Sequence, residues 1–196
     1  MDLEKHLTAT LEESIRAKRE FWEKSRGDFV KAAERLVRVI KEDRKILVFG
    51  NGGSACDALH FAGEWSNRYL RDRKPLPALA LTADATLMSS ISNDYAFSDV
   101  FERQVLALGR QGDVAIGIST SGNSDNVLKG LRAARKQGMT TLVLLGRDGG
   151  KILAETVADH VLLVPGTEVT PRIQECHEWI LHSLCDYVDH KILGAG

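Results

Sequence analysis

The chain has 196 residues, with 26 Lys and Arg against 27 Asp and Glu, so its formal net charge is -1. A hydrophobic fraction of 43% and a charged fraction of 27% are typical of a globular protein and argue against a disordered chain. The length suits one domain, and the lack of a basic excess argues against nucleic-acid or membrane partners.

Three cysteines lack the CxxC spacing of a metal or redox motif: Cys56, Cys176 and Cys185. They are predicted to be reduced thiols of the core, and the protein is expected in the cytoplasm. A charged N-terminus and only short apolar runs predict neither a secretion signal nor a membrane span.

The N-terminal part is predicted to form two helices within residues 1–42. An apolar stripe recurs every four residues over the first 25 residues and indicates an amphipathic helix, formed by Leu3, Leu7, Leu11 and Ile15. Gly27 is expected to end this helix, and Asp28 to cap a second one. The stripe could cover a sheet or contact another subunit.

Residues 43–196 alternate between short apolar runs and helical segments. Strands are predicted at residues 45–49, 77–81, 113–118, 140–145 and 160–164. Helices are predicted at residues 55–69, 86–92 and 97–108, from Ser124 to about 136, and at 171–192. Gly149 and Gly150 are predicted to form a turn. The pattern is typical of an α/β fold, a doubly wound and mainly parallel sheet flanked by helices, in a single domain over 1–196.

Two loops follow predicted strands at the edge where α/β proteins bind ligands. The first, residues 50–54, is GNGGS, which matches neither the dinucleotide nor the Walker phosphate motif. The second, residues 119–124, is STSGNS, and its hydroxyls and backbone N–H groups at a helix N-terminus favour a phosphate. No Lys or Arg lies within either loop, so hydroxyls and dipoles would hold the anion. Ordinary turn chemistry is the alternative.

His60 and Glu64 are four residues apart on one predicted helix, so they share a face. Such a pair is half of a zinc site or an acid/base pair, or else a surface ion pair. Their apolar neighbours favour a pocket. On the last helix His182 lies between apolar residues and is expected to face inward, as part of a site or as a core histidine. Asn93 and Asp94 could form a turn or face the pocket.

In chain order, these motifs resemble the phosphoheptose isomerases of the sugar isomerase (SIS) fold. The resemblance rests on Gly50 to Ser54, Asp57, His60, Glu64, Asn93, Asp94, Gly117 to Ser124, and Arg172 to Glu175. It implies a tetramer that interconverts sedoheptulose 7-phosphate and D-glycero-D-manno-heptose 7-phosphate, the first step of ADP-heptose synthesis.

The resemblance also implies residue roles. The phosphate would lie on Ser119, Thr120, Ser121 and Ser124. Substrate would also contact Asn51, Gly52, Gly53, Ser54, Glu64, Asn93, Asp94 and Gln174. One zinc ion per subunit would be bound by His60, Glu64, Gln174 and His182. Glu64 would be the base and His182 the proton donor of an enediol mechanism.

Gln174 and His182 are eight residues apart, about 12 Å along a straight helix, which is far for two ligands of one zinc ion. We therefore expect a bent helix or a site completed across a subunit boundary. A non-catalytic relative of the replication-initiator-associating type is the main alternative. A sugar-phosphate sensor of a regulator is a third, but no helix-turn-helix segment is predicted.

Overall fold

The computed structural model describes residues 2–194, so residues 1, 195 and 196 of the predicted domain lie outside the described residues. One sheet contains the strands β1 (Ile46–Gly50), β2 (Ala78–Ala80), β3 (Val114–Ser119), β4 (Thr140–Gly146) and β5 (His160–Val164). Their order is β2-β1-β3-β4-β5, and every neighbouring pair is parallel. The predicted α/β class and all five strands are confirmed, with ends that differ by a residue or two.

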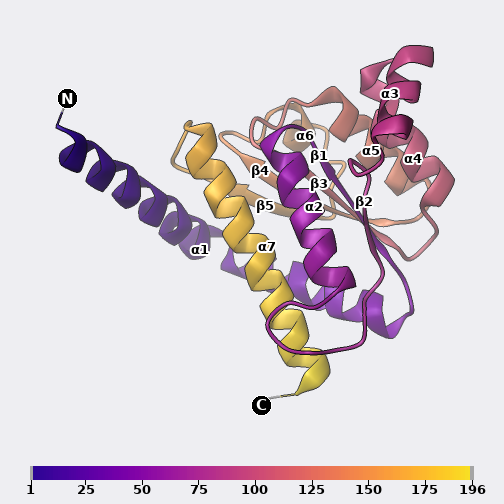
Figure 1. Ribbon diagram of the computed structural model, residues 1–196, viewed down its shortest axis with the longest axis horizontal. Helices are drawn as coiled ribbons and strands as arrows, with labels where there is room; N and C mark the ends of the chain where they lie inside the picture. Colours follow the sequence, from indigo (N-terminus) through magenta and orange to yellow (C-terminus); the bar gives the residue numbers. More distant parts are fainter. Residues whose placement is uncertain (1, 195–196) are drawn as a thin grey trace.

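Helices cover both faces of the sheet (Figure 1). They are α1 (Leu3–Lys41), α2 (Gly53–Ser66), α3 (Ala85–Asp94), α4 (Val100–Leu108), α5 (Asp125–Lys136), α6 (Gly150–Ala154) and α7 (Thr170–Leu193), with a 3₁₀ turn at Phe97–Asp99 before α4. The sequence pattern did not predict α6. Gly149 has the left-handed backbone of a turn, but Gly150, which was predicted to share that turn, is the first residue of the short helix.

The strands divide the apolar core into two layers because successive side chains point to opposite faces. Ile46 and Val48 pack under α1, α2 and α7. Leu47 and Phe49 pack on the other face against residues of α3, α4, α5 and α6. Burial on both faces explains why the strands read as continuous apolar runs.

The N-terminal segment is one helix of 39 residues, so the prediction of two helices separated at Gly27 is wrong. A glycine inside a helix costs only about 0.5 to 1 kcal/mol relative to alanine. Phe21 and Phe29, on either side of Gly27, are both buried in the core of the same layer, and this packing outweighs the cost. Asp28 does not cap a helix but pairs with Lys31 at 3.2 Å.

The cysteine prediction holds for two of the three residues. Cys176 and Cys185 are buried, whereas Cys56 is exposed on α2, so its assignment to the core is wrong. Burial raises the pKa of Cys176 to about 12 and also raises that of Cys185, so neither forms a reactive thiolate near neutral pH. Within the described residues, the helices are too short or too polar for a membrane span.

The strand order creates a switch point beside β1. The chain leaves β1 to form β2 on one side and returns to form β3 on the other. In open α/β sheets, ligands bind at such a point, beyond the carboxyl ends of the strands. The glycine loop follows β1 and the serine loop follows β3, so the fold brings both predicted loops to this crevice.

His177 of α7 makes stability depend on pH. Its ring is fully buried, its Nε2 donates to the carbonyl oxygen of Leu145 at 3.1 Å, and within residues 2–194 its Nδ1 has no partner. Burial lowers its pKa from 6.5 to about 4. The unfolded chain therefore binds this proton first, and the stabilisation present above pH 6.5 is lost as the pH falls toward 4.

We expect His177 to account for a loss of about 3 kcal/mol of unfolding free energy over this range. Urea unfolding at a series of pH values, with EDTA present, measures it. His177→Gln should flatten the dependence between pH 4 and 6.5. Equal slopes in the variant and the wild-type protein would show that this histidine is not the cause.

Candidate active site

The glycine loop after β1 lies against two other parts of the crevice. A Cβ on Gly50 would come within 2.9 Å of the carbonyl oxygen of Ile118 in β3, so only glycine allows this approach. Asn51 and Asn126 exchange two amide hydrogen bonds of 2.8 Å. The side chain predicted to contact the sugar therefore links the glycine loop to the first turn of α5 in this structure.

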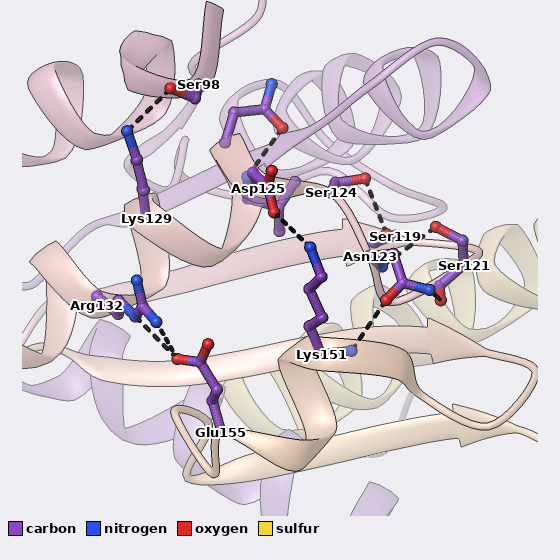
Figure 2. Close-up of polar contacts among 12 residues, drawn as sticks. Ser98, Ser119, Ser121, Asn123, Ser124, Asp125, Lys129, Arg132, Lys151 and Glu155 are labelled. Carbon is purple, nitrogen blue, oxygen red and sulfur yellow. Dashed lines mark hydrogen bonds and ion pairs between the residues drawn. The ribbon is translucent and has the colours of Figure 1, made fainter.

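The serine loop is shaped by hydrogen bonds between its own residues (Figure 2). Ser119 is buried at the end of β3, and its hydroxyl accepts from the N–H of Gly122 and contacts the Ser124 hydroxyl, both at 3.1 Å. The Ser121 hydroxyl accepts from the N–H of Asn123 at 3.2 Å. Ser124 occupies the N-cap position of α5 without capping it through its side chain. The N–H of Val127 in the first turn of α5 donates to Asn126 Oδ1 at 2.9 Å, so the N–H groups of Asp125 and Asn126 are the ones that can face an anion.

The structure brings one cation to the entrance of the serine loop. The Lys151 ammonium of α6 pairs with Asp125 of α5 at 3.3 Å, and the N–H of Lys151 donates to the Asn123 side chain (Figure 2). Both side chains of the ion pair are more than half exposed. The lack of Lys and Arg within the loop is therefore partly offset by a residue distant in sequence.

A second cluster forms where α2 and α7 lie side by side (Figure 1). The Nε2 atoms of His60 and His182 are 2.9 Å apart, and Glu178 Oε1 is 3.3 Å from each of them. All three ligand atoms lie within 4.8 Å of one another, which is close enough for a shared metal ion. Glu178 was missed by the sequence analysis, although it is four residues from both Gln174 and His182. The i, i+4 criterion that selected His60 and Glu64 would have found it.

Glu64 and Gln174 lie next to this cluster. Glu64 Oε1 is 3.6 Å from His60 Nε2. Gln174 instead donates to Asp57 Oδ1 at 3.0 Å, and its amide covers Gly53, where a Cβ would be 2.4 Å from its oxygen. Burial raises the pKa of Asp57 to about 6, against the opposing effect of the Gln174 hydrogen bond. Gln174 is thus directed at Asp57 and not at the two imidazoles, and Glu178 lies between Gln174 and His182 along α7.

His182 is held from two further directions. The Tyr69 ring stacks on it with centroids 5.6 Å apart, and the His60 ring meets it edge-on at 5.1 Å. His182 is thus directed toward α2, but its side chain is 36% exposed and does not point into the core as predicted. A hollow of about 490 Å³ opens beside the cluster. Its walls include Lys18 of α1 together with Asp57, Gln174 and Glu178.

The remaining predicted residues lie at three places. Gly52 and Gly53 are exposed at the start of α2, whereas Ser54 is buried there. Thr120 is half-buried in the serine loop. Asn93 and Asp94 form the last residues of α3, where they are exposed and bonded to each other at 2.9 Å. The site is thus gathered from the loops after β1 and β3 and from α2 and α7.

This arrangement defines a class of protein. Residues 11–146 match the model of the SIS domain family, and the chain has the fold of that class. Over 195 residues it is 42% identical to the phosphoheptose isomerase of Halorhodospira halophila, covering 100% of this chain and 98% of that relative. The chain belongs to the phosphoheptose isomerase family.

Solved structures of relatives agree over the whole chain. The phosphoheptose isomerase of Neisseria gonorrhoeae is 46% identical, with a TM-score of 0.88 over 95% of this chain and 98% of that one. The enzyme of Francisella tularensis is 35% identical, with a TM-score of 0.91 over 97% and 100%. These matches favour the isomerase prediction over a protein-binding or sensory SIS domain.

The serine loop should not tolerate a side chain at Gly122. Its φ is +67°, and a Cβ would lie 2.0 Å from the carbonyl oxygen of Gly149. We expect Gly122→Ala to lower the unfolding free energy by at least about 2 kcal/mol, measured by urea denaturation. Gly27→Ala is the control, because its Cβ meets nothing within 4 Å and should stabilise α1 by about 0.5 to 1 kcal/mol. A neutral Gly122→Ala would contradict the geometry.

Proposed function

We propose that the protein interconverts sedoheptulose 7-phosphate and D-glycero-D-manno-heptose 7-phosphate, the first step of ADP-heptose synthesis. The observation that supports it best is the position of Glu64 and His182. A carboxylate and an imidazole from different helices both lie within 4 Å of His60 Nε2, at 3.6 and 2.9 Å. An enediol mechanism needs such a base and such an acid. The names of the full-length relatives point to the same substrate class.

In the proposed reaction Glu64 removes a proton from C1 of the open ketose while His182 donates a proton to O2, which gives the enediol. Glu64 then returns its proton to C2, and His182 takes the proton from O1, which gives the aldose. Both side chains end in their starting states. His182 also protonates the ring oxygen when the cyclic sugar opens.

Substrate binding is assigned to the loops at the switch point. The phosphate is proposed to lie on the serine loop, at Ser119, Thr120, Ser121 and Ser124, in front of the uncapped first turn of α5. The sugar then extends toward α2 and α7. It contacts Asn51, Gly52, Gly53, Ser54, Asn93, Asp94 and Gln174.

A divalent metal ion, proposed to be zinc, fits between α2 and α7. Two imidazole nitrogens 2.9 Å apart with a carboxylate oxygen 3.3 Å from both are a donor set that zinc favours. When bound, the ion would supply Lewis-acid stabilisation of the sugar oxygens. His60 and His182 are the ligands proposed here from both the resemblance and the structure. Metal content of the purified protein, measured by mass spectrometry, tests the identity of the ion.

The protein is further proposed to be a cytoplasmic homotetramer with its active site near a subunit interface. Leu3, Leu7 and Leu11 are 55 to 61% exposed on the part of α1 that projects beyond the sheet (Figure 1). They do not cover the sheet, and an apolar stripe of this kind favours contact with another helix. The cytoplasmic location is inferred from the three free cysteines.

Incubation with sedoheptulose 7-phosphate should yield an aldoheptose phosphate, detected by mass spectrometry after reduction with borodeuteride. We expect Glu64→Gln to lower kcat roughly 10² to 10⁴-fold, because it removes the base. Glu155→Gln is the control, since this carboxylate lies on the surface beside Arg132 (Figure 2). A wild-type protein without turnover would refute the function, and an active Glu64→Gln would refute the mechanism.

The tetramer can be tested by light scattering. The double variant Leu7→Lys/Leu11→Lys should lower the molar mass below that of a tetramer, because it places charges on the apolar stripe. Leu106→Lys is the control, a leucine of α4 that is 49% exposed and lies on the opposite side of the sheet. A monomeric wild-type protein, or a double variant with unchanged mass, would rule out the assigned contact.

A further inference from the structure

The end of α3 has little apolar packing to hold it in place. Asn93 and Asp94, the two residues proposed to contact the sugar there, are exposed in its last turn. Within the described residues of α3 and of the 3₁₀ turn that follows it, only Ile91 is buried. A segment with so few buried side chains has low local stability, so other contacts must fix its position.

A polar contact from α5 supplies what the apolar core does not. The Lys129 ammonium donates to Asp99 Oδ1 at 2.6 Å and to the Ser98 hydroxyl at 2.9 Å, and Figure 2 shows the contact with Ser98. Asp99 stands at the start of α4 without capping it through its side chain, because its carboxylate is directed at Lys129. The hydrogen bond with Asp99 raises the pKa of Lys129, so the ammonium is charged near neutral pH.

Lys129 lies on the helix that begins at the serine loop. It follows Asp125, the first residue of α5, by about one turn. In the same first turn Asn126 exchanges amide hydrogen bonds with Asn51 of the glycine loop at 2.8 Å. The helix α5 therefore contacts three segments of the proposed site: the glycine loop, the serine loop and, through Lys129, the turn behind α3.

We propose that Lys129 is a positioning residue, which fixes Asn93 and Asp94 relative to the serine loop. It acts through the 3₁₀ turn at Phe97–Asp99, which α3 also contacts. This inference rests on the proposed function. A sugar phosphate held by its phosphate at one end and by Asn93 and Asp94 along the sugar needs a fixed distance between these contacts. Misplacement by 1 Å can cost about 10²-fold in rate.

Steady-state kinetics with sedoheptulose 7-phosphate test this role. Lys129→Met keeps the length of the side chain but removes its charge, and we expect kcat to fall roughly 10 to 100-fold. The inhibition constant of inorganic phosphate should change less than about threefold, because the serine loop is left intact. Lys129→Arg should restore kcat to within about threefold. Lys31→Met is the matched control, since Lys31 pairs with Asp28 at 3.2 Å on α1, away from the site.

Asp99→Asn removes the same contact from the other side. It should lower kcat by a similar factor, and the double variant Lys129→Met/Asp99→Asn should lower it no further, because two changes to one contact are not additive. Circular dichroism measures the folded fraction of each variant, so that a loss of folding is separated from a loss of alignment.

Hydrogen exchange measures the position of α3 without turnover. Lys129→Met should speed the exchange of amides in residues 85–99 more than about tenfold and leave those of β3 unchanged. Wild-type kcat in Lys129→Met, an equal loss of phosphate affinity, or unchanged exchange would each overturn the proposal. A wild-type protein that does not isomerise the sugar would refute the proposed function, whereas exchange that depends on Lys129 would still support its effect on α3.

Discussion

The guanidinium of Arg73 joins α2 to α7, and the candidate site depends on this contact. Its Nε donates to Asp189 of α7 at 2.5 Å, and its other nitrogens donate to the carbonyl oxygens of Glu64 and Trp65 at 2.9 Å. The two charged side chains are only 1% and 3% exposed. Carbonyl groups in the last turn of a helix lack intrahelical partners, so Arg73 satisfies the end of α2 while pairing with α7. Loss of one partner of such a buried pair costs about 3 to 5 kcal/mol. The register that brings His60 to His182 is thus held by a strong contact in the last turn of α2, at Glu64 and Trp65.

The phosphate site proposed at the serine loop raises a different question, namely how a nearly neutral chain would bind an anion. The Ser119 hydroxyl is used within the loop, where it accepts from the N–H of Gly122 and contacts the Ser124 hydroxyl. This leaves backbone N–H groups and the dipole of α5 as the main source of positive potential. The exposed Lys151 adds a charge that is already paired with Asp125. A net charge of -1 is therefore compatible with a phosphate ligand, because recognition depends on local dipoles and not on the total charge.

The sequence predicted most of the fold because a parallel sheet covered on both faces leaves a strong local signal, the continuous apolar strand. Prediction from sequence was wrong where contacts between residues distant in sequence determine the local structure. At Gly27 a weak local penalty competes with the burial of Phe21 and Phe29, which only the tertiary structure reveals. Cys56 occupies the outer face of α2, a direction that a run of apolar neighbours does not specify. Likewise, the pairing of Gln174 with Asp57 joins two helices 117 residues apart, and no local pattern contains it.

The proposed chemistry makes two demands on the same side chains, since a group that binds a metal ion through an atom cannot carry a proton there. Among the carboxylates, Glu178 Oε1 contacts both imidazoles, and Glu64 Oε1 lies 3.6 Å from His60 Nε2. In His182 the two roles can fall on different nitrogens of the same ring. Its Nε2 faces His60 and Glu178, so Nδ1 is the nitrogen available to exchange a proton with substrate. Stacking on Tyr69 holds the plane of that ring and therefore the direction of Nδ1. The proposed proton transfer by His182 therefore requires the sugar to lie on the Nδ1 side of this ring, against α7.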